Sequence, residues 1–112
     1  MFVITFANPK GGSGKTTSAM LLAEQIALSG GQVAILDLDP NANILAWARG
    51  RKEAGREVPF AVHARPQAED TVALIDGLEA GTDYLIIDLE GSKDQIVTFA
   101  LSRTDLCVIP MD

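Results

Sequence analysis

Apolar runs alternate with stretches of helical periodicity along the whole chain. Four of the runs consist mainly of Val, Ile, Leu and Phe with little alternation, and they lie at residues 2–7, 33–38, 84–89 and 106–109. Continuous apolar runs of this length are typical of parallel strands that are covered on both faces. A weaker strand is predicted at 58–63, where Pro59 near its start favours an edge position.

The segments between these strands carry apolar residues at the spacing of an amphipathic helix. In the segment 15–29 the recurring positions are Ala19, Met20, Leu22, Ala23, Ile26 and Ala27. Gly30-Gly31 is expected to end this helix, and further helices are predicted around 44–54 and 72–78. Ser92 and Gln95 match a capping box in front of a last helix. This order of elements predicts a doubly wound α/β fold with a parallel sheet.

The loop between the first strand and the first helix has the composition of a phosphate cradle. Its glycines allow successive backbone N–H groups to face one anion, and the helix N-terminus adds partial positive charge. Lys15 can reach the β- and γ-phosphates, and the Thr16 hydroxyl suits Mg²⁺. The predicted nucleotide-binding residues are Lys10, Gly11, Gly12, Ser13, Gly14, Lys15, Thr16 and Thr17.

This loop departs from the common motif G-x-x-x-x-G-K-[ST] in one respect. Pro9 occupies the position of the first glycine, and a second lysine, Lys10, stands at the front of the loop. The alternative interpretation is a Gly-rich turn with solvated lysines, which the strand–loop–helix context disfavours.

Three carboxylates fall at the predicted carboxyl ends of two strands. Asp37 and Asp39 end the strand at 33–38, and Asp88 lies at the equivalent end of the strand at 84–89. Carboxylates beside a phosphate loop are what a hydrated Mg²⁺ and an attacking water require. The alternative is that these acids only cap the helices that follow them.

Composition and charge narrow the function classes. The 112 residues are 47% hydrophobic and 21% charged, which is the profile of a globular domain and not of a disordered tail. Fifteen acidic and nine basic side chains give a net charge of −6, which excludes a segment that is polybasic as a whole. Cys107 is the single cysteine, and this favours a reducing, cytosolic setting. Because the chain ends directly after a predicted strand, we expect a fragment of a longer fold.

The loop at 10–17 resembles the deviant Walker A box of the ParA/MinD ATPases. Further similarity to the small plasmid-partition ParA proteins of the ParF type lies in Asn8-Pro9, DLDPN at 37–41, LIID at 85–88, Gly91-Ser92 and DLCVIP at 105–110. The resemblance covers nearly the whole chain but only the N-terminal half of a typical member. It implies that residues 1–112 form a single P-loop ATPase domain, or rather its N-terminal portion.

The resemblance also implies a role for each candidate residue. Asp39 corresponds to the residue that positions the attacking water, and Asp37 supports the water shell of the metal. Asp88 looks like the Walker B aspartate, which holds Mg²⁺ together with Thr16. Lys10 is expected to reach across a nucleotide-sandwich dimer to the partner's phosphates, in the manner of an arginine finger supplied in trans. The predicted catalytic residues are therefore Lys10, Lys15 and Asp39.

By resemblance, the protein is a Mg-ATP-dependent ATPase switch with weak intrinsic activity that acts in plasmid or chromosome partitioning. ATP would drive formation of a homodimer that binds DNA nonspecifically, and a ParB-like partner would stimulate hydrolysis. The expected location is the cytoplasm, in association with the nucleoid and not with a membrane. One alternative is a VirC1-like accessory ATPase of DNA transfer. Another is a MinD-like positioning ATPase, which needs a C-terminal amphipathic helix.

Two further classes are weaker: a metallocluster carrier, which needs paired cysteines, and a small-molecule kinase. Other conspicuous residues are expected to be structural. Trp47 is expected to pack, with a dimer face as its alternative, His63 to end an edge strand, and Cys107 to lie in a buried strand. A basic cluster is expected to be a solvated helix end more than a DNA contact, and consists of Arg49, Arg51, Lys52 and Arg56. Glu90 departs from the family pattern, and its role stays open.

Overall fold

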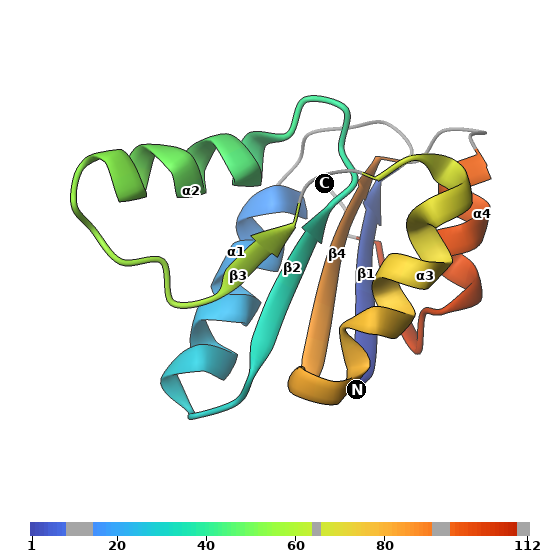
Figure 1. Cartoon of the computed structure of the whole chain (residues 1–112), viewed down its shortest axis with the longest axis horizontal. Helices are drawn as coiled ribbons and strands as arrows, with labels where there is room; N and C mark the ends of the chain where they lie inside the picture. The colour runs from blue at the N-terminus through green and yellow to red at the C-terminus, as the bar shows by residue number, and fades with distance from the viewer. Residues whose placement is uncertain (9–14, 64–65, 91–94, 110–112) are drawn as a thin grey trace.

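The computed structural model describes residues 1–8, 15–63, 66–90 and 95–109. Helices and strands alternate along these residues (Figure 1). The strands are β1 (Phe2–Asn8), β2 (Val33–Asp37), β3 (Ala61–His63), β4 (Tyr84–Glu90) and β5 (Leu106–Val108). The α-helices are α1 (Lys15–Leu28), α2 (Asn43–Glu53), α3 (Thr71–Gly77) and α4 (Gln95–Ser102). Two short 3₁₀ turns are η1 (Ala68–Asp70) and η2 (Glu79–Gly81).

The strands form one parallel sheet in the order β3-β2-β4-β1-β5. This confirms the predicted α/β architecture. The chain passes from β1 to β2, continues outward to β3, and then returns to place β4 between β2 and β1. Ligands of open parallel sheets bind at the carboxyl ends of the strands, near the point where the order reverses. The carboxyl ends of β1, β2 and β4 meet at this point (Figure 1).

Helices cover both faces of the sheet, which explains why the central strands are apolar without alternation. Along β4, Leu85 and Ile87 pack on the side of α3 and α4, whereas Ile86 packs on the side of α1 and α2. Ala19 and Ala23 of α1 are fully buried against the sheet, and their small side chains allow the helix to approach it closely. The two layers of helices are visible on the two sides of the sheet in Figure 1.

The two edge strands are shorter than the apolar runs that predicted them. β3 begins only at Ala61, after Pro59 and the buried Phe60, and its edge position is confirmed. β5 lies at the opposite edge with β1 as its neighbour, and Leu106 is 48% exposed. The prediction that Cys107 is buried is wrong, since the structure leaves it exposed on β5. The apolar residues at 106–109 do not indicate that Cys107 is exposed, because the burial of an edge strand depends on which elements lie beside it.

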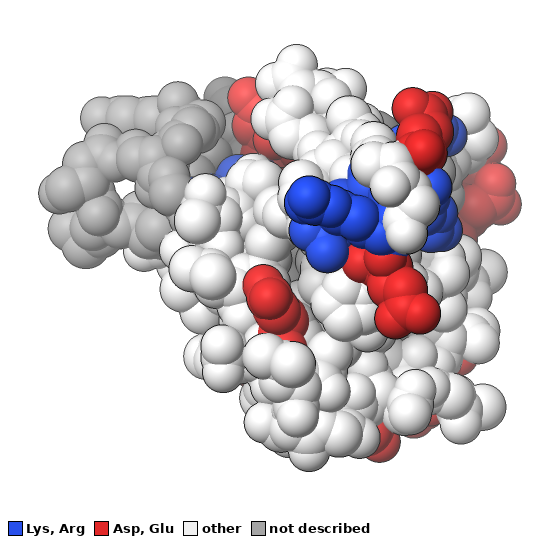
Figure 2. Space-filling model, turned by 90° about the vertical axis from the view of Figure 1, so that its left-hand side faces the viewer, with Lys and Arg blue, Asp and Glu red and all other residues white. Residues whose placement is uncertain are grey.

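Trp47 of α2 is a packing residue, as predicted. Its ring stacks on Phe60 with 5.9 Å between ring centroids, and the Arg51 guanidinium carbon lies 5.1 Å from the Trp47 centroid. Arg51 also donates two hydrogen bonds to the Glu57 carbonyl oxygen. Arg51, one member of the basic cluster, therefore stabilises the end of α2. The side chains of Arg49, Lys52 and Arg56 are exposed. Figure 2 shows basic side chains gathered on this side of the molecule with acidic ones beside them.

Candidate functional site

The candidate site lies where α1 begins, at the carboxyl ends of β2 and β4. Lys15 is the first residue of α1, and Asp37 and Asp88 are paired in register on the neighbouring strands β2 and β4. The structure therefore brings together residues that are far apart in the sequence. Lys10, Gly11, Gly12, Ser13 and Gly14 lie outside the described residues, as does the Ser92 of the predicted capping box.

Lys15 is buried between two carboxylates. Its Nζ lies 2.6 Å from Asp88 Oδ1 and 3.3 Å from Asp39 Oδ2, and its side chain is only 2% exposed. A buried ammonium group is tolerated only when it is paired and hydrogen-bonded, so these carboxylates set the position of the Lys15 head group. The sequence predicted all three residues for one site, and the structure shows them in direct contact.

Asp88 also contacts the second residue of α1. Its Oδ2 accepts a hydrogen bond of 3.0 Å from Thr16 Oγ1, and the side chain is fully buried. Its Oδ1 receives no hydrogen bond within the described part of the chain, although it forms the ion pair with Lys15. A buried carboxylate oxygen beside a hydroxyl, with spare capacity as an acceptor, has the chemistry of a ligand for a hard cation.

Asp37 has a different environment. Its Oδ2 accepts hydrogen bonds of 3.1 Å from the backbone N–H groups of Ile44 and Leu45, and its Oδ1 accepts one of 3.3 Å from Asp39 N–H. Ile44 and Leu45 belong to the first turn of α2, whose N-cap residue Ala42 supplies no side-chain acceptor. Asp37 therefore caps α2 from the preceding strand, and its role toward a metal stays a prediction.

Burial is the main influence on the ionisation of Asp37. Loss of water around its carboxylate raises the pKa of Asp37 above the ordinary value, and the nearby charges of Asp88 and Asp39 act in the same direction. The hydrogen bonds from the backbone N–H groups of Leu45 and Asp39 lower the pKa and offset part of this effect. The site thus keeps a carboxylate where burial works against its charge.

Asp39 lies between the buried cluster and solvent. Its Oδ1 accepts a hydrogen bond of 2.9 Å from Asn41 N–H, which closes a tight turn, and its Oδ2 faces Lys15. The residue is 7% exposed, against 1% for Asp37 and 0% for Asp88. Of the three carboxylates, Asp39 thus has the most access to water, which suits the predicted water-positioning role.

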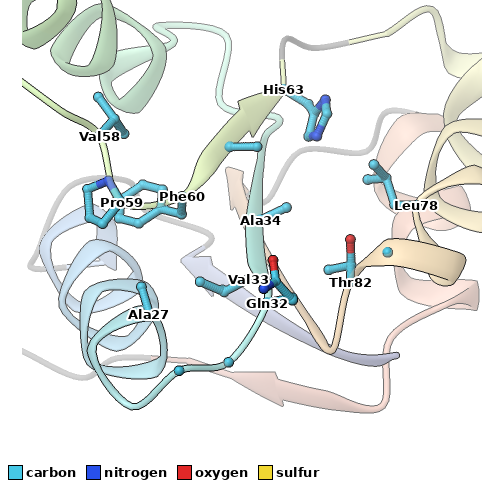
Figure 3. A pocket seen from close by; sticks show the side chains of 14 residues that line it. Ala27, Gln32, Val33, Ala34, Val58, Pro59, Phe60, His63, Leu78 and Thr82 are labelled. Atoms are coloured by element: carbon cyan, nitrogen blue, oxygen red, sulfur yellow. The ribbon is translucent and has the colours of Figure 1, made fainter.

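A cavity in the described part of the chain is separate from this site. It measures about 670 Å³ and lies beside the amino-terminal half of β2, between the end of α1, β3 and the turn before β4. Figure 3 shows Phe60 on one side of β2 and Leu78 and Thr82 on the other, with His63 at the upper rim. The described residues that line it include no Lys, Arg, Asp or Glu.

The described residues lack two further features. No helix among them is long and apolar enough to cross a membrane. No group of three or more His, Cys, Asp or Glu side chains among them is arranged to hold a metal ion. Mg²⁺ at nucleotide sites commonly takes only one or two carboxylates and completes its shell with phosphate oxygens and water. Thr16 and Asp88 therefore fit such an ion.

Sequence comparison supports these observations. Residues 4–106 match the CobQ/CobB/MinD/ParA nucleotide binding domain. Protein ParA of Rhizobium radiobacter is 37% identical over 113 residues, covering 99% of this chain and 49% of the relative. The chromosome-partitioning ATPase Soj of Thermus thermophilus is 46% identical, covering 96% of this chain and 53% of the relative. For protein VirC1 of Rhizobium rhizogenes it is 30%, with 98% and 48% covered. The chain thus spans about half the length of the curated relatives it matches.

Solved structures show the same fold. A putative plasmid partition protein from Borrelia burgdorferi, bound to AMPPNP, superposes with a TM-score of 0.80 at 22% identity, covering 98% of this chain and 62% of that one. The pNOB8 ParA protein bound to nonspecific DNA gives a TM-score of 0.78 at 18% identity, covering 100% and 54%. At these identities the likeness establishes the architecture of the sheet and its helices.

Proposed function

The chain belongs to the CobQ/CobB/MinD/ParA nucleotide-binding domain family, and from this premise we propose that it is the N-terminal portion of a Mg-ATP-dependent, dimerising ATPase switch in plasmid or chromosome partitioning. The observation that carries the proposal is the buried contact of Lys15 with Asp88 and Asp39 at the carboxyl ends of β2 and β4. A cation and two acids at this edge of a parallel sheet are suited to phosphoryl transfer.

The charges of the site favour binding of nucleotide together with a metal ion. Among the described residues, Lys15 is the one buried cation; it contacts Asp39 and Asp88, and a third buried acid, Asp37, lies beside them. A triphosphate carries further negative charge, so it needs additional positive charge to occupy the same region. When bound, Mg²⁺ would supply that charge and neutralise phosphate oxygens. Thr16 and Asp88 are the described residues that would hold it.

The protein groups would then act on the nucleotide in distinct ways. Lys15 exchanges a carboxylate partner for the β- and γ-phosphate oxygens and stabilises negative charge on them. Asp39, with its access to water, orients the water for attack on the γ-phosphate. Lys10 contributes a second positive charge from the partner subunit of the dimer, as the resemblance of its loop implies. The Gly-rich composition of the loop predicts that its backbone N–H groups would contact the phosphates.

The relatives support DNA as one of the partners that we propose. Proteins named ParA and Soj are similar over nearly the whole chain, and a ParA of the same fold was solved with nonspecific DNA. We therefore propose an ATP-dependent homodimer that binds DNA nonspecifically, is stimulated by a ParB-like protein, and works in the cytoplasm at the nucleoid. Because the net charge of this chain is −6, most of the DNA-binding surface is expected to lie outside it.

A second candidate is an accessory ATPase of DNA transfer. It is favoured by the similarity to VirC1 proteins of two Rhizobium species, at 30% and 29% identity. The nucleotide site would be the same in both cases. A partition defect on deleting the gene supports the first function, and a defect in conjugative transfer with normal plasmid inheritance supports the second.

Calorimetric titration with ATP and Mg²⁺ tests the nucleotide site. We expect Lys15→Ala to weaken binding by at least about tenfold, since a hydrogen bond between charged groups contributes about 1.5–3 kcal/mol. Lys52→Ala is the matched control, because it removes the same type of side chain from the exposed end of α2. Circular dichroism verifies that both variants are folded at the titration temperature. Equal affinity of Lys15→Ala and the wild-type protein would refute the assignment of the phosphate loop.

A further inference from the structure

Asp37 is buried with no described cation in contact with it. It is 1% exposed, and no Lys or Arg in the described ranges lies within ion-pair distance of its carboxylate. Asp88 is its register partner on β4 and Asp39 follows two residues later, so these two described charged neighbours are acids. Burying a carboxylate among acids costs free energy, which indicates that the hydrogen bonds it accepts have a specific structural role.

Those hydrogen bonds join three separate parts of the site. Asp37 Oδ2 holds the N–H groups of Ile44 and Leu45 in the first turn of α2, and Oδ1 holds the N–H group of Asp39. Ala42, the residue before α2, has a left-handed backbone conformation with φ +51° and no side-chain acceptor. The first N–H groups of α2 are therefore capped by Asp37. One carboxylate thus fixes the end of β2, the backbone of Asp39 and the start of α2 relative to one another.

Asp39 depends on this arrangement to face Lys15. Its own Oδ1 is engaged by Asn41 N–H, and its Oδ2 lies 3.3 Å from Lys15 Nζ. A shift of the Asp39 backbone would therefore move the oxygen that faces Lys15. Meanwhile Asp37 already uses three of the roughly four acceptor positions of a carboxylate for backbone N–H groups.

We propose that Asp37 is a positioning residue, which keeps Asp39 beside Lys15 by anchoring the Asp39 backbone to the start of α2, and that it is not part of the water shell of the metal. This inference rests on the proposed function only in the role that it gives to Asp39. It replaces the metal-related role that the resemblance implies for Asp37. Binding of nucleotide and Mg²⁺ should then be independent of Asp37, whereas turnover should depend on it.

The test compares Asp37→Asn with Asp88→Asn in the complete gene product. The two residues are register partners on adjacent strands, so the same substitution is made at the same edge of the sheet. Asparagine retains an oxygen that can accept from α2, but its NH₂ group cannot accept from Asp39 N–H. For Asp37→Asn we expect kcat to fall by about 10–100-fold, the usual effect of losing a group that orients another. The KM for ATP and the Mg²⁺ concentration for half-maximal activity should stay within about twofold of wild type, and we expect that Mg²⁺ requirement to rise for Asp88→Asn.

A second readout does not require turnover. In ¹⁵N-labelled protein without nucleotide, the backbone amide signals of Asp39, Ile44 and Leu45 report the hydrogen bonds to Asp37. We expect the Asp39 signal to change in Asp37→Asn and all three to change in Asp37→Ala. If Asp37→Asn does not fold, Asp37→Glu takes its place, since it keeps the charge and displaces the carboxylate by one methylene.

The outcomes separate this inference from the proposed function. A higher Mg²⁺ requirement in Asp37→Asn, equal to that of Asp88→Asn, would assign Asp37 to the metal and overturn the inference. Unchanged kcat, or an unchanged Asp39 amide signal, would overturn it as well. Absence of ATP binding and hydrolysis in the wild-type protein would refute the proposed function instead, and the amide signals would still decide whether Asp37 anchors Asp39.

Discussion

Replacing Lys15 with methionine tests how strongly the buried ion pairs hold the site together. Methionine keeps an apolar stem of similar length and removes the charge. At an effective dielectric constant of 20, the 2.6 Å contact with Asp88 amounts to an attraction of about 6 kcal/mol, and the 3.3 Å contact with Asp39 to about 5 kcal/mol. These attractions are largely offset by the cost of removing three charges from water, so the loss on mutation is smaller than their sum.

The relevant magnitude is the cost of leaving Asp88 buried without its cation. Breaking a buried pair by removing one partner destabilises a protein by about 3–5 kcal/mol. We therefore expect Lys15→Met to lower the free energy of unfolding by that amount in the absence of nucleotide. With an m-value of about 2 kcal/mol/M, the midpoint of urea unfolding would fall by about 2 M. Circular dichroism at 222 nm follows the transition.

Two further variants make this result specific to the buried pair. Arg103→Met breaks the ion pair with Asp76, whose side chains are 43% and 51% exposed, and it should shift the urea midpoint far less. Lys15→Met combined with Asp88→Asn removes both charges, and it should recover part of the loss through a coupling of about 0.5–3 kcal/mol. A loss below about 1 kcal/mol in Lys15→Met, together with no recovery in the double variant, would show that the pair does not stabilise the fold.

Four other outcomes are expected. Lys10→Ala should retain ATP binding but impair dimerisation or hydrolysis, which sedimentation and phosphate release measure; loss of binding by the monomer would contradict a role in trans. Asp39→Ala should bind ATP without turnover and remain dimeric, whereas wild-type turnover would place the water-positioning role elsewhere. Burial raises the pKa of Asp37 in the folded state above its ordinary value of 3.8, so ionisation of this side chain destabilises the fold as the pH rises above 3.8. In urea unfolding between pH 3.5 and 7, the stability of Asp37→Asn relative to wild type should therefore increase with pH. The 112-residue chain alone should bind nucleotide weakly with poor ATP-over-GTP selectivity, and multiple turnovers above a Lys15→Ala control would contradict this.

The amino-acid sequence by itself determined the architecture and predicted the location of the candidate site. Continuous apolar runs predicted parallel central strands, because a strand covered on both faces has no polar side to alternate with. The Gly-rich loop at 10–17 and the acids that end the strands at 33–38 and 84–89 predicted where phosphate and metal chemistry would gather. These features are local, since a few consecutive residues carry each of them.

The tertiary structure decided what each charged group contacts. Lys15 pairs with Asp88 across 73 positions because α1 and β4 meet at one edge of the sheet, and no spacing in the sequence encodes that distance. Asp37 caps α2 because the left-handed step at Ala42 turns the first N–H groups of the helix toward β2. Cys107 is exposed because β5 is an edge strand. Each of these facts depends on which elements become neighbours, and long-range packing sets that.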